Sequence, residues 1–331
     1  MTALLGTARR MLMAPSFGEV GFQARGFGLT PTAATRRLEQ IPQSVVMGFA
    51  WGIELPSLAE LEQHLALVEP EMRGFAYEGA TMACTIRDAM AGGRGRRTRD
   101  LLDGPGRRHI FLAYIGIGFA MARLPRPLWK NVVPDLRDVP YHPVMSWLAV
   151  DGYGFDLAYF HTERWVGGQR RPKPYPFDGH PGYFLRSVDH GIGRALWFIH
   201  GGRPADVAAR LAGFATERHA DLWAGVGLAA TFAGGAGAHD YETLRRAAGP
   251  HRAQLAQGAV FAAKARDLSG HQPAHTAVAV GALTGMSPES ASALADDVTT
   301  TSAEGSGDMP AYELWRRRIA GRFEPAAAAP S

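Results

Sequence analysis

The chain has 331 residues, 46% hydrophobic and 20% charged, which is enough apolar material for one large or two modest folded domains. Its formal net charge of +4 is small and spread along the chain, which excludes an electrostatic surface for nucleic acid or anionic membrane. The single cysteine, Cys84, excludes an internal disulfide and a thiolate metal cluster, as suits a reducing cytoplasm.

No targeting or membrane segment is predicted. Residues 1–14 contain two arginines after a short apolar stretch and lack the longer apolar region of a signal peptide. The longest apolar run, 110–122, has 13 residues, whereas a helix that spans a membrane needs about 20. We expect a cytoplasmic protein that associates with a membrane only through a partner.

The residue pattern predicts a mostly α-helical protein. Period-2 alternation of β-branched residues is scarce, while Ala, Leu, Arg and Glu recur every three or four positions. Predicted helices cover residues 32–39, 58–67, 79–91, 110–122, 144–161, 189–200, 205–214, 219–232, 241–248, 252–268 and 311–322. Glycine-rich stretches at 92–99 and 166–182 are predicted to be exposed loops. These predictions divide the chain into an N-terminal helical region (1–165), a Pro/Gly-rich connection (166–186), a helix-pair region (187–322) and a disordered tail (323–331).

A spacing of 33 to 34 residues recurs in the C-terminal half. LWAGVGLAA at 222–230 aligns with LAQGAVFAA at 255–263, and GIGRA at 191–195 lies 34 residues before GVGLA at 225–229. Each small-residue helix precedes a second amphipathic helix, so the period predicts stacked helix pairs, as in α-solenoids. The alternative is chance similarity within an ordinary helical domain.

Three G-x-G segments begin at Gly116, Gly191 and Gly225 and raise the question of a dinucleotide site. Such glycines bind a pyrophosphate where they follow a β-strand and open a helix. Each of these segments instead lies within a helical pattern. We interpret them as sites of close helix packing, and we predict no cofactor, neither NAD nor FAD.

The densest group of polar and aromatic residues is DGYGFDLAYFHTE at 151–163. On a helix, Asp156 and Glu163 share one face, and the segment can line a catalytic pocket. The alternative is that its carboxylates cap a helix or pair with arginines. No spacing typical of a metal site occurs, and we predict no metal.

The segment DDVTTTSAE at 296–304 matches the pattern with which type I terpene cyclases hold magnesium. Its oxygen ligands would be Asp296, Thr300 and Glu304 on one helix face. The β-branched threonines disfavour a long helix there, and no D-D-x-x-D segment precedes it. A Mg-dependent terpene cyclase is therefore kept as an alternative hypothesis.

Six groups of unusual strings occur in order along the chain. They are RGFAYEGA (73–80), DGYGF (151–155) with AYF (158–160), GIGRALWF (191–198), DLW (221–223) with GLAA (227–230), QLAQG (254–258) and PAYELW (310–315). Together they resemble the UnbL-type family of unknown biochemical function, which is encoded in the conserved cassettes for enediyne polyketide biosynthesis in actinomycetes. The resemblance runs from about residue 20 to residue 322. It implies a pathway in which accessory proteins, with UnbV-type and UnbU-type partners among them, turn a released polyene into the enediyne core.

From these strings we predict an elongated apolar cavity that binds a linear polyene, a hydrophobic small molecule. Its predicted aromatic lining is Phe75, Tyr77, Tyr153, Phe155, Tyr159, Phe160, Trp197 and Phe198. Glu78, Asp151 and Arg194 are predicted to orient the ligand, and Glu78, Asp151 and Asp156 are candidate acid/base residues. The alternative is that the aromatic side chains only form the core.

A noncatalytic scaffold is the other main hypothesis. In it the helix-pair region presents a surface to UnbV-type and UnbU-type proteins, one of which is embedded in the membrane. The hypothesis follows from the repeat and from the lack of a complete catalytic or cofactor motif in the sequence.

Overall fold

A computed structural model describes residues 16–92, 95–307 and 309–324, and this part of the chain is all α. The β contact found among these residues is an isolated bridge between Ser306 and Met309. None of the described helices is long and apolar enough to cross a membrane. The prediction of a mostly α-helical protein is confirmed. The predictions for residues 1–14 and for most of the 323–331 tail fall outside the described residues.

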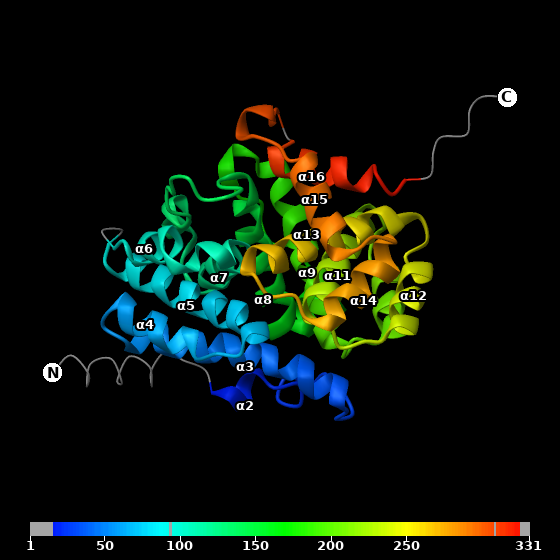
Figure 1. The fold of residues 1–331 in the computed structure, drawn as a ribbon, viewed down its shortest axis with the longest axis horizontal. Coiled ribbons are helices and arrows are strands. Elements are labelled where there is room, and N and C mark those ends of the chain that lie inside the picture. Colours follow the sequence, from blue (N-terminus) through cyan, green and yellow to red (C-terminus); the bar gives the residue numbers. More distant parts are fainter. Residues whose placement is uncertain (1–15, 93–94, 308, 325–331) are drawn as a thin grey trace.

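A curved array of helices forms the body of the protein (Figure 1). Each member packs on the next along the chain: α3 (Ala33–Glu54), α5 (Pro70–Met90), α7 (Ile110–Arg123), α8 (Leu148–Phe160), α9 (Pro181–Ile199), α11 (His219–Ala233) and α13 (Arg252–Ser269). The array bends back on itself, so that Phe232 of α11 makes an edge-to-face contact with Phe75 of α5. Phe261 of α13 makes a similar contact with Phe111 of α7.

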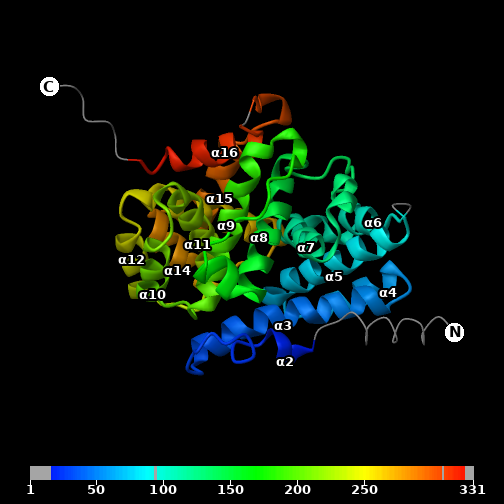
Figure 2. The same ribbon diagram turned by 180° about the vertical axis from the view of Figure 1, so that it is seen from behind.

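Helix pairs stack in the C-terminal half, as the 33 to 34 residue period predicted. An outer layer of α10 (Pro204–Ala212), α12 (Ala238–Ala247) and α14 (Ala274–Thr284) accompanies α9, α11 and α13, and α12 packs on both α10 and α14. Figure 2 shows this layer at the opposite end of the molecule from α4 (Leu58–Ala66) and α6 (Arg97–Asp103). The prediction of a solenoid-like half is therefore confirmed.

Further helices close the edges of the array. The short α2 (Phe17–Val20) packs on α3, while α15 (Pro288–Asp297) and α16 (Ala311–Ala320) pack on α13. In both ribbon views α3 and α16 lie at opposite edges of the molecule (Figures 1 and 2). The space between α3 and the helices α7, α8 and α9 is where the candidate site lies.

Pairs of glycines let neighbouring helices of the array touch through their backbones. A Cβ on Gly152 of α8 would lie 2.3 Å from the carbonyl oxygen of Ile115 on α7, and one on Gly154 would lie 2.2 Å from that of Val188 on α9. Because residues two apart on a helix point about 200° apart, one G-x-G serves two opposite neighbours. At each crossing a glycine from either helix packs against the backbone of the other helix. The pairs are Gly48 with Gly79, Gly118 with Gly152, Gly154 with Gly191, Gly193 with Gly225 and Gly227 with Gly258. The structure thus uses the G-x-G segments for close helix packing.

Several predicted boundaries were wrong. Helix α3 continues through Pro42 to Glu54, although a proline normally ends or kinks a helix. Helix α5 begins at Pro70, well before residue 79, and α9 begins at Pro181, inside the predicted connection 166–186. The prediction missed α6, α14 and α15, and α6 begins inside the predicted loop 92–99. These helices are short or have many small residues, so tertiary packing rather than a hydrophobic period stabilises them.

Candidate functional site

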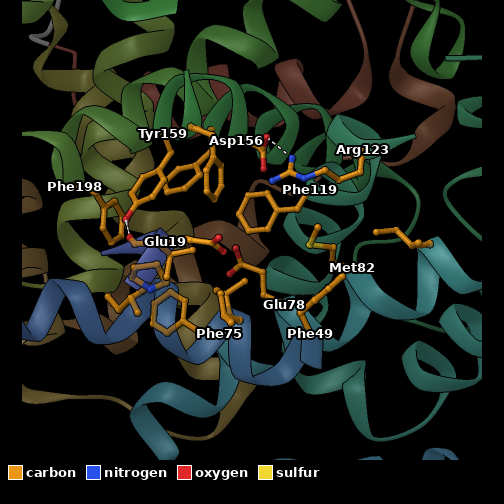
Figure 3. A pocket seen from close by; sticks show the side chains of 18 of the residues that line it. Glu19, Phe49, Phe75, Glu78, Met82, Phe119, Arg123, Asp156, Tyr159 and Phe198 are labelled. Atoms are coloured by element: carbon orange, nitrogen blue, oxygen red, sulfur yellow. Dashed lines mark hydrogen bonds and ion pairs between the residues drawn. The ribbon is translucent and has the colours of Figure 1, made fainter. Parts of the chain in front are cut away.

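An apolar cavity of about 710 Å³ lies between α3 and the side of the array formed by α5, α7, α8 and α9. Its volume is within the usual range for small-molecule sites, and its lining is mainly hydrophobic. The strings at 73–80, 151–160 and 191–198 all contribute to it. Figure 3 shows the Glu78 carboxyl group pointing into the space between Phe75 and Phe119.

One stripe along α5 gives the cavity its length. Phe75, Glu78, Met82, Ile86 and Met90 line it at intervals of three or four residues, which places them on a single helix face. Phe75 and Met90 are fifteen positions apart, so at about 1.5 Å per residue the stripe is roughly 22 Å long. The site therefore fits an extended ligand.

Helix α3 forms the wall beside this stripe. Its lining residues are Ile41, Pro42, Val45, Val46 and Phe49, again on one face. Helix α3 crosses α5 closely because Gly48 and Gly79 have no side chain there; a Cβ on Gly79 would lie 1.8 Å from the carbonyl oxygen of Val45. The small residues thus set the separation of the two walls.

The facing wall is aromatic. Phe155 and Tyr159 of α8 stack with ring centroids 5.5 Å apart, and Phe155 makes an edge-to-face contact with Phe198 of α9 at 5.5 Å. Phe119 of α7 lies 5.7 Å from Phe155. Flat, rigid rings of this kind offer a large apolar contact surface with little conformational freedom to lose on binding.

The segment around α2 borders the cavity through Glu19 and Val20. Its position is fixed by the Tyr159 hydroxyl, which donates to the carbonyl oxygen of Val20 at 2.6 Å. Arg25 donates to the carbonyl oxygen of Phe160 at 2.5 Å. The Tyr159 side chain and the Phe160 backbone therefore hold this segment against α8.

Glu78 is a buried carboxyl group without a hydrogen-bond partner on Oε2, and only 2% of the residue is exposed. Burial raises its pKa from 4.5 to about 8; Arg194 opposes this shift and Asp151 adds to it. At neutral pH the group is therefore mostly the uncharged acid, which can donate a hydrogen bond or a proton. Helix α7 approaches its backbone closely, since a Cβ on Gly116 would lie 2.1 Å from the Glu78 carbonyl oxygen.

Asp151 lies behind the cavity wall, completely buried. It accepts hydrogen bonds from Arg194 through Oδ1 and from His190 Nδ1 through Oδ2, the latter at 2.5 Å. Burial works against its ionisation, but Arg194 and His190 outweigh this and lower its pKa below the ordinary value. Arg194 lines the cavity and Asp151 does not. Asp151 therefore orients the Arg194 guanidinium rather than facing a ligand.

Asp156 does line the cavity, and Arg123 donates to its Oδ1 at 2.6 Å. Burial raises its pKa, although Arg123 acts in the opposite direction. Arg123 is about 41% exposed in its side chain, so this ion pair lies toward the surface. Asp156 is thus committed to a partner, whereas Glu78 is free to meet a ligand.

Three of the predicted lining residues point elsewhere. Tyr77 stacks on His109 with ring centroids 4.6 Å apart, on another face of α5 from Glu78. Tyr153 contacts Trp129 edge to face, and the Trp197 indole donates to the carbonyl oxygen of Gly234 at 2.8 Å. Successive helical residues point about 100° apart. A string of aromatic residues on one helix cannot all enter one cavity, and Tyr77, Tyr153 and Trp197 do not line this one.

The other three groups of strings meet at a different place. Arg316 of α16 donates to Asp221 Oδ1 at 2.8 Å, to Gln257 Oε1 at 3.1 Å and to Glu313 Oε2 at 3.1 Å. All four side chains are buried. This network joins α16 to α11 and α13, so these strings stabilise the fold and do not line the cavity.

The α3 wall, Phe119, Arg123 and the α2 segment were not predicted from sequence as parts of the cavity. The helix predicted in the α3 region ended at residue 39, before the α3 residues that line the cavity. Phe119 lies in the apolar run 110–122, where nearly every residue is hydrophobic and no face is distinguished. No sequence signal indicated that Glu19 lies beside residues of α5 and α8.

The segment 296–304 is not one continuous helix. Helix α15 ends at Asp297, and Ser302–Glu304 form a separate short 3-10 helix. Asp296 accepts hydrogen bonds from Lys264 and Tyr141, Thr300 donates to the Ala311 carbonyl, and Glu304 pairs with Arg318. The ligand arrangement of a cyclase magnesium site is therefore not present in this segment. Among the described residues, no group of three or more His, Cys, Asp and Glu side chains is placed to hold a metal ion.

The fold and the site define an all-α protein with an elongated apolar cavity whose described lining includes a buried carboxyl group with one oxygen that lacks a hydrogen-bond partner. Residues 4–323 match the family described as protein of unknown function (DUF1702), and the chain belongs to this family. Neither a curated protein nor a solved structure matches the chain.

Proposed function

We propose that this protein takes part in enediyne biosynthesis and binds a linear polyene polyketide intermediate in the cavity between α3 and α5, α7, α8 and α9. The observation that carries the proposal is the shape of that cavity. A stripe of roughly 22 Å along α5 faces a wall of stacked aromatic rings, which suits a long, flat and apolar molecule.

The sequence resemblance supports the pathway. Its strings supply Phe75 and Glu78 from α5, Phe155 from α8, and Arg194 and Phe198 from α9, all of which line the cavity. These helices belong to one array, in which α7 lies between α5 and α8 and α9 packs on α8. The residues that suggest enediyne cassettes are thus among those that shape the proposed binding site.

Glu78 is the acid/base group of the proposed site. It is the carboxyl group in the cavity that is both deeply buried and unpartnered, and at neutral pH it holds a proton. Asp151 has a positioning role, because both of its oxygens bind side chains that it orients. Asp156 balances the charge of Arg123.

Binding can be tested with diphenylhexatriene and parinaric acid, linear polyenes whose fluorescence rises in an apolar site. We expect saturable binding with one polyene per chain. Met82→Trp should weaken it more than tenfold, because the indole ring would fill the middle of the α5 stripe. Leu67→Trp is the matched control, since Leu67 is 85% exposed and lies outside the cavity. Equal binding by both variants would contradict the proposed site.

The pathway can be tested by deleting the gene in a strain that makes an enediyne. We expect the enediyne to disappear and the released polyene to remain, with recovery on complementation by the wild-type gene but not by a Met82→Trp gene. A normal enediyne yield in the deletion strain would refute the proposal. Recovery by the Met82→Trp protein, together with its co-purification with UnbV-type and UnbU-type proteins, would instead favour a scaffold role.

A further inference from the structure

A second, much smaller hollow adjoins the cavity at Glu78. It has a volume of about 30 Å³ and lies inside the curve of the helix array. Phe75, Glu78, Arg194 and Phe198 line both spaces, so they form the boundary between them. A volume of this size accommodates about one oxygen-sized group.

Glu78 and Arg194 are the polar residues of this small hollow; the rest of its lining is apolar. Glu78 Oε2 is buried and has no hydrogen-bond partner, although a buried polar atom without one is costly and uncommon. The Arg194 guanidinium is held by Asp151 and lies over the Phe155 ring, 5.1 Å from its centroid. Two residues with hydrogen-bonding side chains thus border a space that is large enough only for the end of a ligand or a short substituent.

The charges of the site disfavour an anionic ligand. Both arginines that line the cavity in the described part of the chain are already paired, Arg123 with Asp156 and Arg194 with Asp151. Glu19 adds a further carboxylate to the lining. A carboxylate on the ligand would find no unpaired cation there, whereas a neutral oxygen needs none.

We propose that Glu78 and Arg194 form a recognition site for one neutral oxygen group, a hydroxyl or carbonyl, near one end of the polyene. This inference rests on the proposed function and specifies its ligand. The Glu78 carboxyl group donates a hydrogen bond to the ligand oxygen. The Arg194 guanidinium is the other polar group beside that oxygen. On α5, Phe75 lies three positions before Glu78 and Met90 lies twelve positions after it. The polyene would therefore extend roughly 5 Å from Glu78 in one direction and 18 Å in the other.

Three tetraenes with the same chromophore test this assignment: octadecatetraene, which is a hydrocarbon, parinaryl alcohol and parinaric acid. At neutral pH the wild-type protein should bind the alcohol about tenfold more tightly than the hydrocarbon, as expected for one good buried hydrogen bond. It should bind the acid more weakly than the alcohol. Glu78→Leu should abolish the preference for the alcohol and leave hydrocarbon binding intact or improved.

Glu78→Gln separates hydrogen bonding from a structural role, because its amide still donates and should restore most of the preference for the alcohol. Leu67→Ala, at an 85% exposed position outside both spaces, should keep the wild-type preference. Equal binding of the hydrocarbon and the alcohol by wild-type protein would overturn this assignment alone. A wild-type protein that binds none of the three tetraenes would overturn the proposed function as well.

Discussion

Asp151 of α8 and Arg194 of α9 form a buried ion pair in which the guanidinium lines the cavity and the carboxylate lies behind its wall. The two helices come close enough for this pair because Gly191 packs on the Asp151 backbone, where a Cβ would lie 1.9 Å from the carbonyl oxygen. The glycine packing and the polar site are therefore parts of one arrangement, and each can be tested.

Asp151→Asn should destabilise the protein by about 3–5 kcal/mol, because Arg194 would remain buried without its counter-charge. Urea denaturation measures this change in the free energy of unfolding. Asp206→Asn is the control: its partner Arg203 is 54% exposed, and such surface pairs contribute about 1 kcal/mol or less. Adding Arg194→Leu to Asp151→Asn should recover part of the loss. Equal losses for the two single variants would contradict the role given to Asp151.

Stability should depend on pH through Glu78. Its pKa is about 8 in the folded protein and 4.5 in the unfolded chain, so between these values the folded state retains a proton that the unfolded state releases. The contribution of Glu78 to the free energy of unfolding therefore falls as pH rises from about 4.5 to about 8, by at most about 1.4 kcal/mol per pH unit. Below 4.5 its contribution is fully present.

Glu78→Gln removes this dependence. The difference in unfolding free energy between variant and wild type should shift in favour of the variant by a few kcal/mol between pH 5 and pH 8. Taking the difference cancels the titration of the other groups that both proteins share. Urea denaturation at several pH values measures it, and a difference that stays constant across this range would show that Glu78 does not titrate as described.

Gly154→Ala should destabilise the fold by about 1–3 kcal/mol or more, because a methyl group would force α8 away from the Val188 backbone of α9. Gly281→Ala is a matched control in α14, where an added Cβ has no neighbour within 4 Å. That change should stabilise the protein by up to about 1 kcal/mol through the better helix propensity of alanine. Thermal or urea unfolding compares the two, and a neutral Gly154→Ala would mean that the helices do not meet as closely as described.

Tyr159→Phe should loosen the segment around α2, which borders the cavity. It removes the hydroxyl that donates to the Val20 carbonyl oxygen and keeps the ring, so the expected cost is about 1–2 kcal/mol. Amide hydrogen exchange should become faster in residues 17–27. Tyr241→Phe also removes a buried hydroxyl donor, to the Ala230 carbonyl, and serves as the control because that bond is remote from this segment. Faster exchange in both variants would point to a global rather than a local effect.

Much of the fold could be predicted from sequence because helical periods and small-residue repeats are local. The period of 33 to 34 residues located the stacked pairs, and the absence of strand patterns around the G-x-G segments indicated helix packing. The course of α3 could not be read in the same way. Pro42 is unfavourable within a helix. Beyond Pro42, contacts such as that between Gly48 and Ala76 hold α3 against α5. Local propensity was outweighed by packing.

The candidate site was predictable only in part. Phe75 and Glu78 line the cavity, while Tyr77 lies on the opposite side of the same helix in a separate apolar cluster. A string of aromatic residues shows that a helix is buried all round, but it does not show which face meets a void. Residues from α2 and α3 carried no functional motif at all, yet they form one side of the cavity.

The helical fold and the positions where small residues allow helices to touch could be predicted without a structure, since both follow from side-chain size and spacing along the chain. Which acidic group is free was decided only by tertiary structure. Asp151, Asp156 and Glu78 are equivalent carboxyl groups in the sequence, but the folded chain places an arginine against the first two and leaves an oxygen of the third unpartnered beside a cavity. Whether a carboxyl group is paired depends on distances between helices, and a local sequence pattern does not contain those distances.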